Sequence, residues 1–314
     1  MGGPAVGLRL PPVLTAMRRL LSFLVVLGCT LVMDFMAWGV ALGEHNYIRG
    51  YEKPFELLEQ TTGSRRIVLI GGSSIAWGIS AQKLSNELGV PVVNFGIHAG
   101  VGYRRHWELL EGKLDPKTDT LLVSPEYGLP RKVSWLDRSP LFCQVKVGIL
   151  REWSPTCTGF GLYRFVSLVW TQGEAYDPRG FNDHGDYIAR ADDRTLDERR
   201  EVNDLCPSLD SDGAAEYRAL WEGVRDLGFR VLYLPTVVPD EARCRDGSME
   251  AWQREMVEFF GTENSSAQVT FFRASDFFDT EYHLTLHGQE RRTAMTLQFL
   301  RSALEGGAVA EGGR

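Results

Sequence analysis

The fold follows from one stretch, Ile67-Val68-Leu69-Ile70-Gly71-Gly72-Ser73-Ser74, in which an apolar run ends in two glycines and two serines. A short run rich in β-branched residues that stops at glycines is typical of a strand buried on both faces. The glycines allow a sharp turn at the carboxyl end of this strand and place a serine hydroxyl at the edge of a sheet. The N–H groups that follow can point toward an oxyanion, although a serine that simply caps a helix gives the same pattern. The stretch lacks the Lys of a P-loop and the glycine spacing of a dinucleotide-binding turn.

Strands and helices alternate along the rest of the chain. The pattern predicts further strands at 91–95, 120–123, 230–234 and 269–272, and helices at 80–88, 103–114, 214–227, 249–260 and 290–304. This alternation indicates an α/β fold with a mostly parallel sheet, covered by helices on both faces, whose active site lies at the carboxyl ends of the strands. Residues from about 131 to 207 are irregular and rich in Gly, Pro and aromatic residues, so we expect an insertion over one end of the sheet.

The N-terminal part contains an apolar run from Leu20 to Leu42 with a single charge, Asp34. As a helix this run would measure roughly 34 Å, which is enough to cross a bilayer. Arg9, Arg18 and Arg19 precede it, which favours a cytoplasmic N-terminus. We therefore expect five parts: a basic cytoplasmic tail (1–19), a transmembrane anchor (20–42), a polar stalk (43–64), a globular domain (65–305) and a disordered tail (306–314).

Three other interpretations of the apolar run stay open. It could be a cleaved signal peptide, with the cleavage site at Ala41-Leu42-Gly43, a lipid anchor attached at Cys29, or a buried core helix. The mean hydropathy of −0.17 excludes a polytopic membrane protein but not a single span. The net charge of −7 argues against a general binder of nucleic-acid backbones. Residues 1–42 carry three Arg and one Asp, or +2, so the remainder carries −9 and is distinctly acidic.

The cysteines agree with export. Four of them follow the apolar run: Cys143, Cys157, Cys206 and Cys244. Their number is even and no CxxC spacing occurs, so disulfides are expected and a metal site is not. Pairing of sequence neighbours, 143 with 157 and 206 with 244, is one of three possible connectivities. Four free thiols are the alternative.

A second polar motif, Asp279-Thr280-Glu281-Tyr282-His283, lies between the last predicted strand and the last predicted helix. It therefore belongs at the same end of the sheet as the serines. An imidazole there can take the proton of a serine, and a carboxylate can fix the tautomer of that imidazole. The candidate triad is Ser73, His283 and Asp279, with Ser74 as a competing nucleophile and Glu281 as a competing acid. His287 is expected to be an ordinary loop residue.

Three segments together carry a family resemblance: IGGSS (70–74), VVNFGIHAG (92–100) and FFDTEYHLTLHG (277–288), the last followed by ERRT. They resemble the SGNH, or GDSL-like, hydrolase superfamily, and most of all its membrane-anchored bacterial members that modify exopolysaccharides and the cell envelope. The resemblance covers roughly 65–128 and 225–304. It implies a three-layer α/β/α sandwich and esterase or O-acyltransferase chemistry at Ser73. It also implies an oxyanion hole that includes the N–H groups of Ser73 and Gly100 or, less well, of Gly96.

Two positions depart from the family pattern. Gly72 stands where the family has Asp, and no Asn follows the third strand, which continues as Val123-Ser124-Pro125-Glu126-Tyr127. Tyr127 or Asn182 could replace the missing oxyanion donor. Glu126 could bind sugar hydroxyls, orient a substrate, or be a carboxylate buried for structural reasons. The polar and aromatic residues around Asn182 suit carbohydrate recognition or, alternatively, a tight polar turn.

Two functions remain open. The first is a serine esterase or O-acyltransferase, anchored in a bacterial inner membrane with its domain in the periplasm, that acts on acyl esters of envelope or secreted polysaccharide. The second is a catalytically inactive SGNH-like scaffold or binding component of an envelope polysaccharide assembly. The expected partners are the polysaccharide or another acyl-ester substrate, the membrane and other envelope assembly proteins. No cofactor, metal or nucleic acid is expected.

Overall fold

The computed structural model describes residues 12–41, 47–96, 98–127, 150, 178–189, 205–206, 212–266 and 271–311. Four parallel strands form the central sheet in the order β2-β1-β3-β4. Their bounds are Arg66–Gly71 (β1), Val92–Phe95 (β2), Asp119–Ser124 (β3) and Arg230–Tyr233 (β4). The α/β class with a mostly parallel sheet, predicted from the apolar runs, is confirmed. These strands read as apolar runs because both of their faces are buried.

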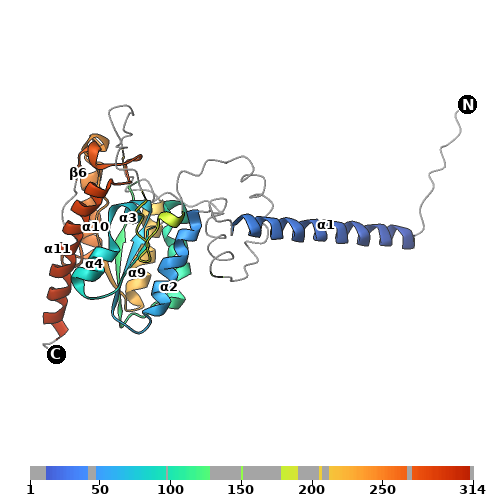
Figure 1. The fold of residues 1–314 in the computed structure, drawn as a ribbon, viewed down its shortest axis with the longest axis horizontal. Helices are drawn as coiled ribbons and strands as arrows, with labels where there is room; N and C mark the ends of the chain where they lie inside the picture. Colours follow the sequence, from blue (N-terminus) through green and yellow to red (C-terminus); the bar gives the residue numbers. More distant parts are fainter. Residues whose placement is uncertain are drawn as a thin grey trace, which may run out of the picture.

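Helices cover both faces of this sheet. Val68 and Ile70 of β1 point into one apolar layer, whereas Ile67 and Leu69 point into the other. The first layer holds α2 (Glu52–Gln60), α5 (Tyr103–Leu110), α9 (Asp212–Asp226) and α10 (Ser248–Phe260). The second layer holds α3 (Ser73–Gly78), α4 (Ala81–Leu88) and α11 (Leu286–Glu311). In Figure 1, α4 and α11 lie on one side of the strands and α2 lies on the other, an arrangement compatible with a three-layer sandwich.

The order of the strands determines where a crevice opens. The chain leaves β1 toward β2 on one side of the sheet and leaves β3 toward β4 on the opposite side, although β1 and β3 are neighbours. Their register aligns Gly71 with Ser124 at the carboxyl ends. In open α/β sheets, ligands bind outside the carboxyl ends of two such diverging strands. The segments that follow β1 and β3, beginning at Gly72 and Pro125, therefore form the two walls of the expected site.

Several elements differ from the sequence-based expectation. The predicted strand at 269–272 is described only as β6 (Phe271–Phe272), which pairs with β5 (Val238–Pro239) outside the central sheet. The predicted helix at 103–114 ends at Leu110 and continues as a 3-10 turn, η3 (Glu111–Lys113). The last helix begins at Leu286 rather than at 290.

Part of the expected stalk belongs to the folded body. Residues 47–60 form the 3-10 helix η1 (Tyr47–Tyr51) and α2. Phe55 and Leu58, three residues apart on one face of α2, are buried in the first layer. In the part of the chain that the structure describes, the other 3-10 helices are η2 (Ala99–Val101), η6 (Pro178–Gly180), η7 (Asp240–Ala242), η8 (Thr262–Asn264) and η9 (Ala274–Asp276).

The N-terminal helix α1 (Pro12–Ala41) extends away from the sheet (Figure 1). Its side chains are exposed from residue 17 to residue 32. Within the part of the chain that the structure describes, none of the helices combines the length and the apolar character that crossing a membrane requires. The anchor expected at 20–42 stays a prediction.

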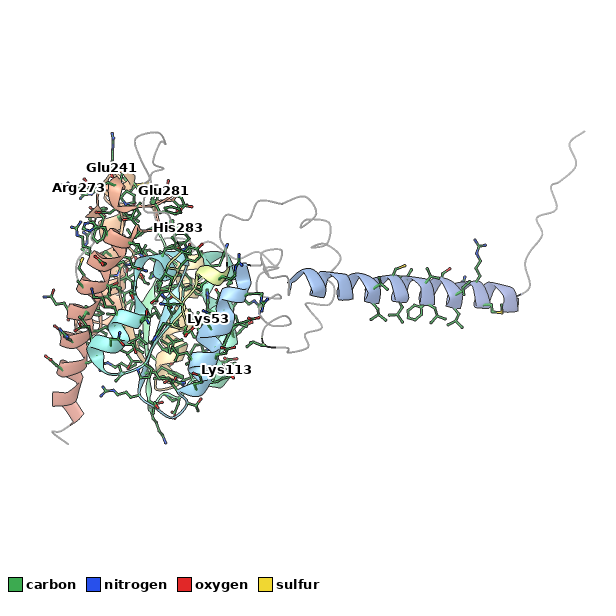
Figure 2. The ribbon with its side chains drawn as sticks, viewed as in Figure 1. Lys53, Lys113, Glu241, Arg273, Glu281 and His283 are labelled. Atoms are coloured by element: carbon green, nitrogen blue, oxygen red, sulfur yellow. A yellow bond between two sulfur atoms is a disulfide. The ribbon has the colours of Figure 1, made fainter. Side chains whose placement is uncertain are left out.

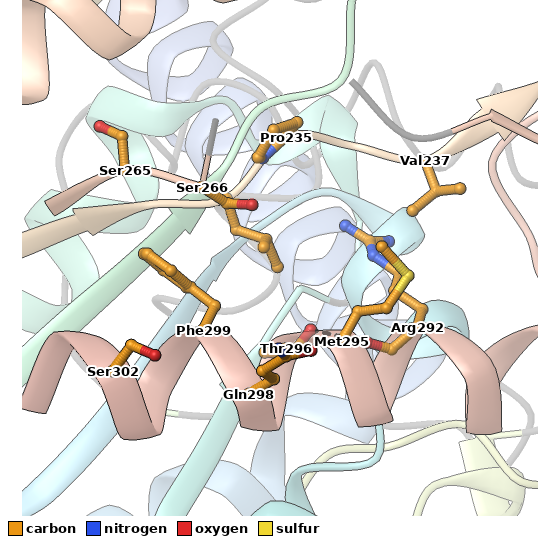
Figure 3. Close-up of a pocket in the computed structure, with 11 residues that line it drawn as sticks. Pro235, Val237, Ser265, Ser266, Arg292, Met295, Thr296, Gln298, Phe299 and Ser302 are labelled. Carbon is orange, nitrogen blue, oxygen red and sulfur yellow. Dashed lines mark hydrogen bonds between the residues drawn. The ribbon is translucent and has the colours of Figure 1, made fainter. Parts of the chain in front are cut away.

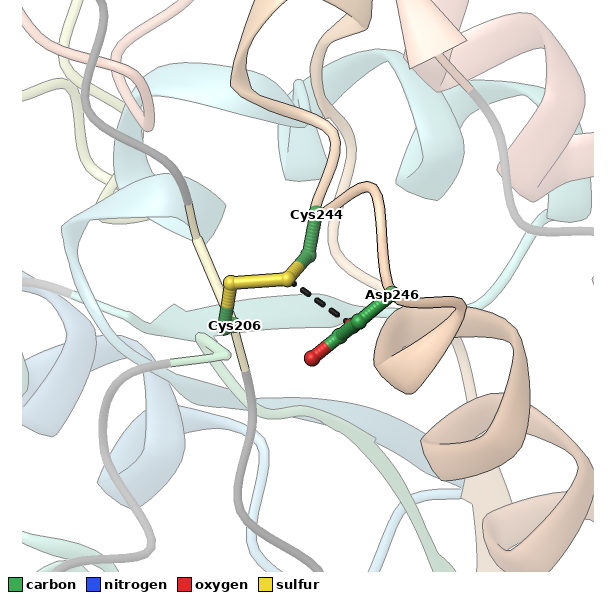
Figure 4. A group of neighbouring side chains, drawn as sticks. All are labelled: Cys206, Cys244 and Asp246. Atoms are coloured by element: carbon green, nitrogen blue, oxygen red, sulfur yellow. Dashed lines mark hydrogen bonds between the residues drawn. A yellow bond between two sulfur atoms is a disulfide. The ribbon is translucent and has the colours of Figure 1, made fainter.

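One of the expected disulfides is present. Cys206 and Cys244 are bonded across a sequence separation of 38 residues, and the neighbouring residues Leu205 and Arg243 form a parallel β-bridge. The other expected pair, Cys143 and Cys157, lies outside the described residues. Asp246 Oδ1 lies 2.9 Å from Cys244 Sγ (Figure 4). These three side chains could otherwise surround a metal, but sulfurs bonded to each other offer no thiolate ligand.

Candidate active site

Ser73 lies where β1 turns into α3. Gly72 has extended backbone (φ −89°, ψ −167°) and precedes the first helical residue, Ser73. The side chain of Ser73 is half-buried, whereas Ser74 is fully buried. Of the two candidate nucleophiles, Ser73 is the one whose hydroxyl contacts the imidazole of His283.

The three predicted triad residues converge. Ser73 Oγ lies 2.8 Å from His283 Nε2, and His283 Nδ1 lies 2.8 Å from Asp279 Oδ1. A carboxylate can only accept, so Nδ1 carries the proton and Nε2 is left to accept from the Ser73 hydroxyl. The competing acid, Glu281, is buried but is not the partner of Nδ1. The geometry is that of a nucleophile, a base and a group that orients the base.

His283 is held by its backbone and by its ring. The peptide N–H of Phe278 donates to the carbonyl of His283 at 2.7 Å, beside a β-bridge between Phe277 and Leu284. The imidazole stacks on Trp77, with ring centroids 4.6 Å apart and planes only 10° from parallel. Trp77 lies four residues after Ser73 on α3, so one short helix carries both the nucleophile and the platform for its base. Figure 2 shows His283 at the carboxyl end of the sheet, near Glu281.

Glu126 forms the opposite wall of the serine turn. Its Oε1 accepts the peptide N–H of Ser74 at 2.9 Å, and its own N–H donates to the Tyr103 hydroxyl at 3.0 Å. Burial raises the pKa of Glu126, and the N–H of Ser74 opposes that rise. A Cβ atom at Gly72 would overlap the Glu126 carboxylate. The glycine that departs from the family pattern is therefore required as long as Glu126 occupies this place.

Arg292 approaches the same turn from α11. Its Nη1 donates to the carbonyl of Ser74 at 2.7 Å, and its Nη2 donates to Ser124 Oγ at 2.9 Å. Burial lowers the pKa of Arg292 to about 10, opposed by the negative charge of Glu126. The guanidinium therefore keeps its charge at neutral pH.

The expected oxyanion donors differ in their availability. Ser73 N–H is at the first turn of α3, where no intrahelical acceptor exists. Gly100 lies in η2, whose Ala99 Cβ is 2.9 Å from the place that a Cβ at Gly72 would take, so this 3-10 turn borders the serine. In contrast, Gly96 N–H already donates to Asn94 Oδ1 at 3.0 Å. Tyr127 is buried within the first apolar layer, and among the described residues its hydroxyl has no hydrogen-bond partner.

Asn182, a predicted substrate contact, instead stabilises a polar turn. Its Oδ1 accepts the N–H groups of His184 and Asp186, at 3.0 and 2.9 Å, and its Nδ2 donates to the Asp186 carboxylate. Asp186 in turn accepts the N–H groups of Ala81 and Gln82 at the start of α4. The structure shows the alternative interpretation of this motif, a tight polar turn, because the amide oxygen and the amide nitrogen of Asn182 both bond to other residues of the chain.

Three residues near the site were not assigned roles from the sequence. Trp77 follows the first motif and Arg292 follows the last one. Nothing in the local sequence indicates their roles, because a ring stack and a buried guanidinium depend on contacts between distant segments. His98 lies in the second motif, and its pKa is lowered by burial and by the nearby imidazole of His283. The only feature of the sequence that could have placed His98 near the site is that it lies within the VVNFGIHAG segment.

A separate hollow of about 350 Å³ lies between the end of β4 and α11 (Figure 3). The described residues that line it include Val237, Arg292 and Phe299 but no member of the triad.

Comparison of the chain with models of protein families, with curated proteins and with solved structures gives no match. The chemistry of the site is therefore argued from its own geometry.

Proposed function

We propose that this chain is an SGNH-like serine esterase or O-acyltransferase that acts on acyl esters, such as acetyl esters, of cell-envelope or secreted polysaccharide. The observation that carries the proposal is the continuous hydrogen-bonded path from Ser73 through His283 to Asp279. Such a path activates a serine that would otherwise be a weak nucleophile at neutral pH.

The reaction follows from the positions of the three groups. As Ser73 Oγ attacks the ester carbonyl, its proton passes to His283 Nε2, and Asp279 stabilises the imidazolium that results. The proposed donors to the developing oxyanion are the N–H groups of Ser73 and Gly100. His283 then returns the proton to the leaving alcohol, and an acyl-serine remains.

The second half of the reaction decides between hydrolysis and transfer. His283 Nε2 accepts a proton from water or from a sugar hydroxyl as that oxygen attacks the acyl carbon. It then returns the proton to Ser73 Oγ as the bond between Ser73 and the acyl group breaks. Water gives the free acid, whereas a sugar hydroxyl gives a new ester. The half-exposed serine leaves access for either acceptor.

The proposed location is a bacterial inner membrane, with α1 as a single anchor and the domain in the periplasm. The basic residues before the apolar run support this orientation. The Cys206–Cys244 disulfide supports an oxidising compartment.

A catalytically silent scaffold is the second candidate, and Glu126 is the observation that favours it. The family places an oxyanion donor after the third strand, but this chain places a buried carboxylate there. Loss of one such donor typically costs about 10²–10³ in kcat. A carboxylate near the oxyanion would oppose its charge in addition.

Turnover of an aryl acetate by purified variants separates the two candidates. We expect Ser73→Ala to lose all turnover above background, whereas Ser74→Ala retains at least about a tenth of it, because the buried Ser74 hydroxyl is not the group that His283 contacts. Circular dichroism confirms that both variants fold. Equal turnover in wild type and Ser73→Ala would exclude the esterase proposal and favour the scaffold.

A further inference from the structure

The short helix that carries the nucleophile lacks an ordinary N-cap. The N-cap position of α3 is Gly72, which has no side chain and makes no capping hydrogen bond. An N-cap side chain normally accepts the N–H of the second or third helical residue. The second helical residue here is Ser74, and its N–H donates to Glu126 Oε1 at 2.9 Å. The acceptor therefore comes from the segment after β3, more than fifty residues away in sequence.

Glu126 and a side chain at position 72 exclude each other. A Cβ at Gly72 would overlap the Glu126 carboxylate and would lie 2.9 Å from Ala99 Cβ. The carboxylate thus fills the space into which an aspartate at position 72 would place its own acceptor. The two departures from the family motifs, Gly72 and Glu126, are in contact and compensate for each other.

The same residue is also held through its carbonyl. Arg292 Nη1 donates to the Ser74 carbonyl at 2.7 Å, so the N–H of Ser74 binds a buried carboxyl group and its C=O binds a buried guanidinium. Glu126 and Arg292 are 5 % and 2 % exposed. Both side chains are therefore shielded from water, and each holds the backbone of Ser74 in place.

We propose that Glu126 is a positioning residue of the serine site: it caps α3 in place of a side chain at position 72 and, with Arg292, fixes the backbone of Ser74, the residue that follows the nucleophile. Its effect on catalysis rests on the proposed function, but its effect on α3 does not. Glu126 holds Ser73 within reach of His283 and donates no proton to the substrate.

Relocating the cap tests this proposal in the full-length chain. The variants are Glu126→Ala, Glu126→Gln, the double variant Gly72→Asp/Glu126→Ala, and Glu108→Gln as a control for removal of a carboxylate on α5. The two measurements are the rate at which a fluorophosphonate labels Ser73 and hydrogen exchange in the peptide that contains α3.

We expect Glu126→Ala to slow labelling by about 100-fold, because a misplaced nucleophile loses that much even when its chemistry is unchanged. Glu126→Gln, whose amide oxygen can still accept from Ser74, stays within about tenfold of wild type. The double variant recovers to within about tenfold, because an aspartate at the N-cap supplies the acceptor after a small shift of Ala99. Exchange in α3 rises in Glu126→Ala and falls again in the double variant. Glu108→Gln changes neither measurement.

The proposal would be overturned if Ser73 were labelled in Glu126→Ala at the wild-type rate. It would also be overturned if Ser73 were labelled no faster in the double variant than in Glu126→Ala. If Glu126→Ala does not fold, recovery of folding in the double variant is the supporting result, and failure of both to fold is the contrary one. If the wild type itself takes up no label, the proposed function fails, and hydrogen exchange alone still decides whether Glu126 caps α3.

Discussion

Replacing Asp279 by Asn probes the acidic member of the triad. Asp279 Oδ1 accepts the proton of His283 Nδ1 at 2.8 Å. An asparagine at this position can present its own N–H to Nδ1, which shifts the ring proton to Nε2. Nε2 can then no longer accept the proton of Ser73, so the substitution removes the base without removing the imidazole.

The expected loss follows from the exposure of the carboxylate. In a serine protease with a buried aspartate, the same substitution lowers kcat by about 10⁴. The Asp279 side chain is 33 % exposed, so water can take part of its role and the amide can turn outward. We therefore expect kcat to fall by about 10²–10³, which corresponds to about 3–4 kcal/mol in the activation free energy.

The assay is steady-state hydrolysis of an aryl acetate across a range of pH. Glu281→Gln is the matched control, since Glu281 is a nearby buried carboxyl that does not contact Nδ1. It is expected to stay within about threefold of wild type, or about 0.6 kcal/mol. The reasoning is refuted if Asp279→Asn also stays within that range, or if Glu281→Gln shows the larger loss.

Three further predictions concern stability. Burial lowers the pKa of His106 from 6.5 to about 4, so the unfolded chain binds the proton more tightly. The free energy of unfolding should therefore fall by about 3 kcal/mol as the pH drops from about 6.5 to 4. His106→Gln should flatten this dependence in urea titrations, and an unchanged slope would speak against it. Cys206→Ser/Cys244→Ser should lose about 2–4 kcal/mol of unfolding free energy under non-reducing conditions; equal stability would mean that the bond constrains little. Trp77→Ala should cost about 3–5 kcal/mol by calorimetry and also slow the labelling of Ser73, because the ring of His283 loses its platform; a stable variant with normal labelling contradicts this.

The sheet and the triad could be predicted because their signals are local. A strand buried on both faces is a continuous apolar run, and β1 and β3 are such runs. Parallel strands end at one edge, so the serine after the first strand and the histidine before the last helix were expected near each other. They are, although β6, the strand that was expected to lead to the histidine, lies outside the central sheet. This reasoning brought Ser73 and His283 together from positions 210 residues apart in sequence.

The rest of the site depends on contacts between distant segments that leave no local pattern. Asn182 looked like a sugar-binding residue because amides suit both hydroxyl recognition and turns, and only the fold shows that it bonds to its own turn and to Gln82 of α4. Glu126 looked like the loss of an oxyanion donor, whereas its contact with Ser74 shows a cap supplied from another strand. α2 looked like a stalk because its few apolar residues, such as Phe55, are separated by charged ones.

The most direct test of the central claim is covalent labelling of the full-length chain with a fluorophosphonate, followed by mass spectrometry of its peptides. The reagent reacts only with a serine whose proton a neighbouring base can take. The account predicts one adduct, on Ser73, that disappears in His283→Ala. No adduct, or an adduct on Ser73 that persists without His283, would contradict the claim that this hydrogen-bonded path is an active site.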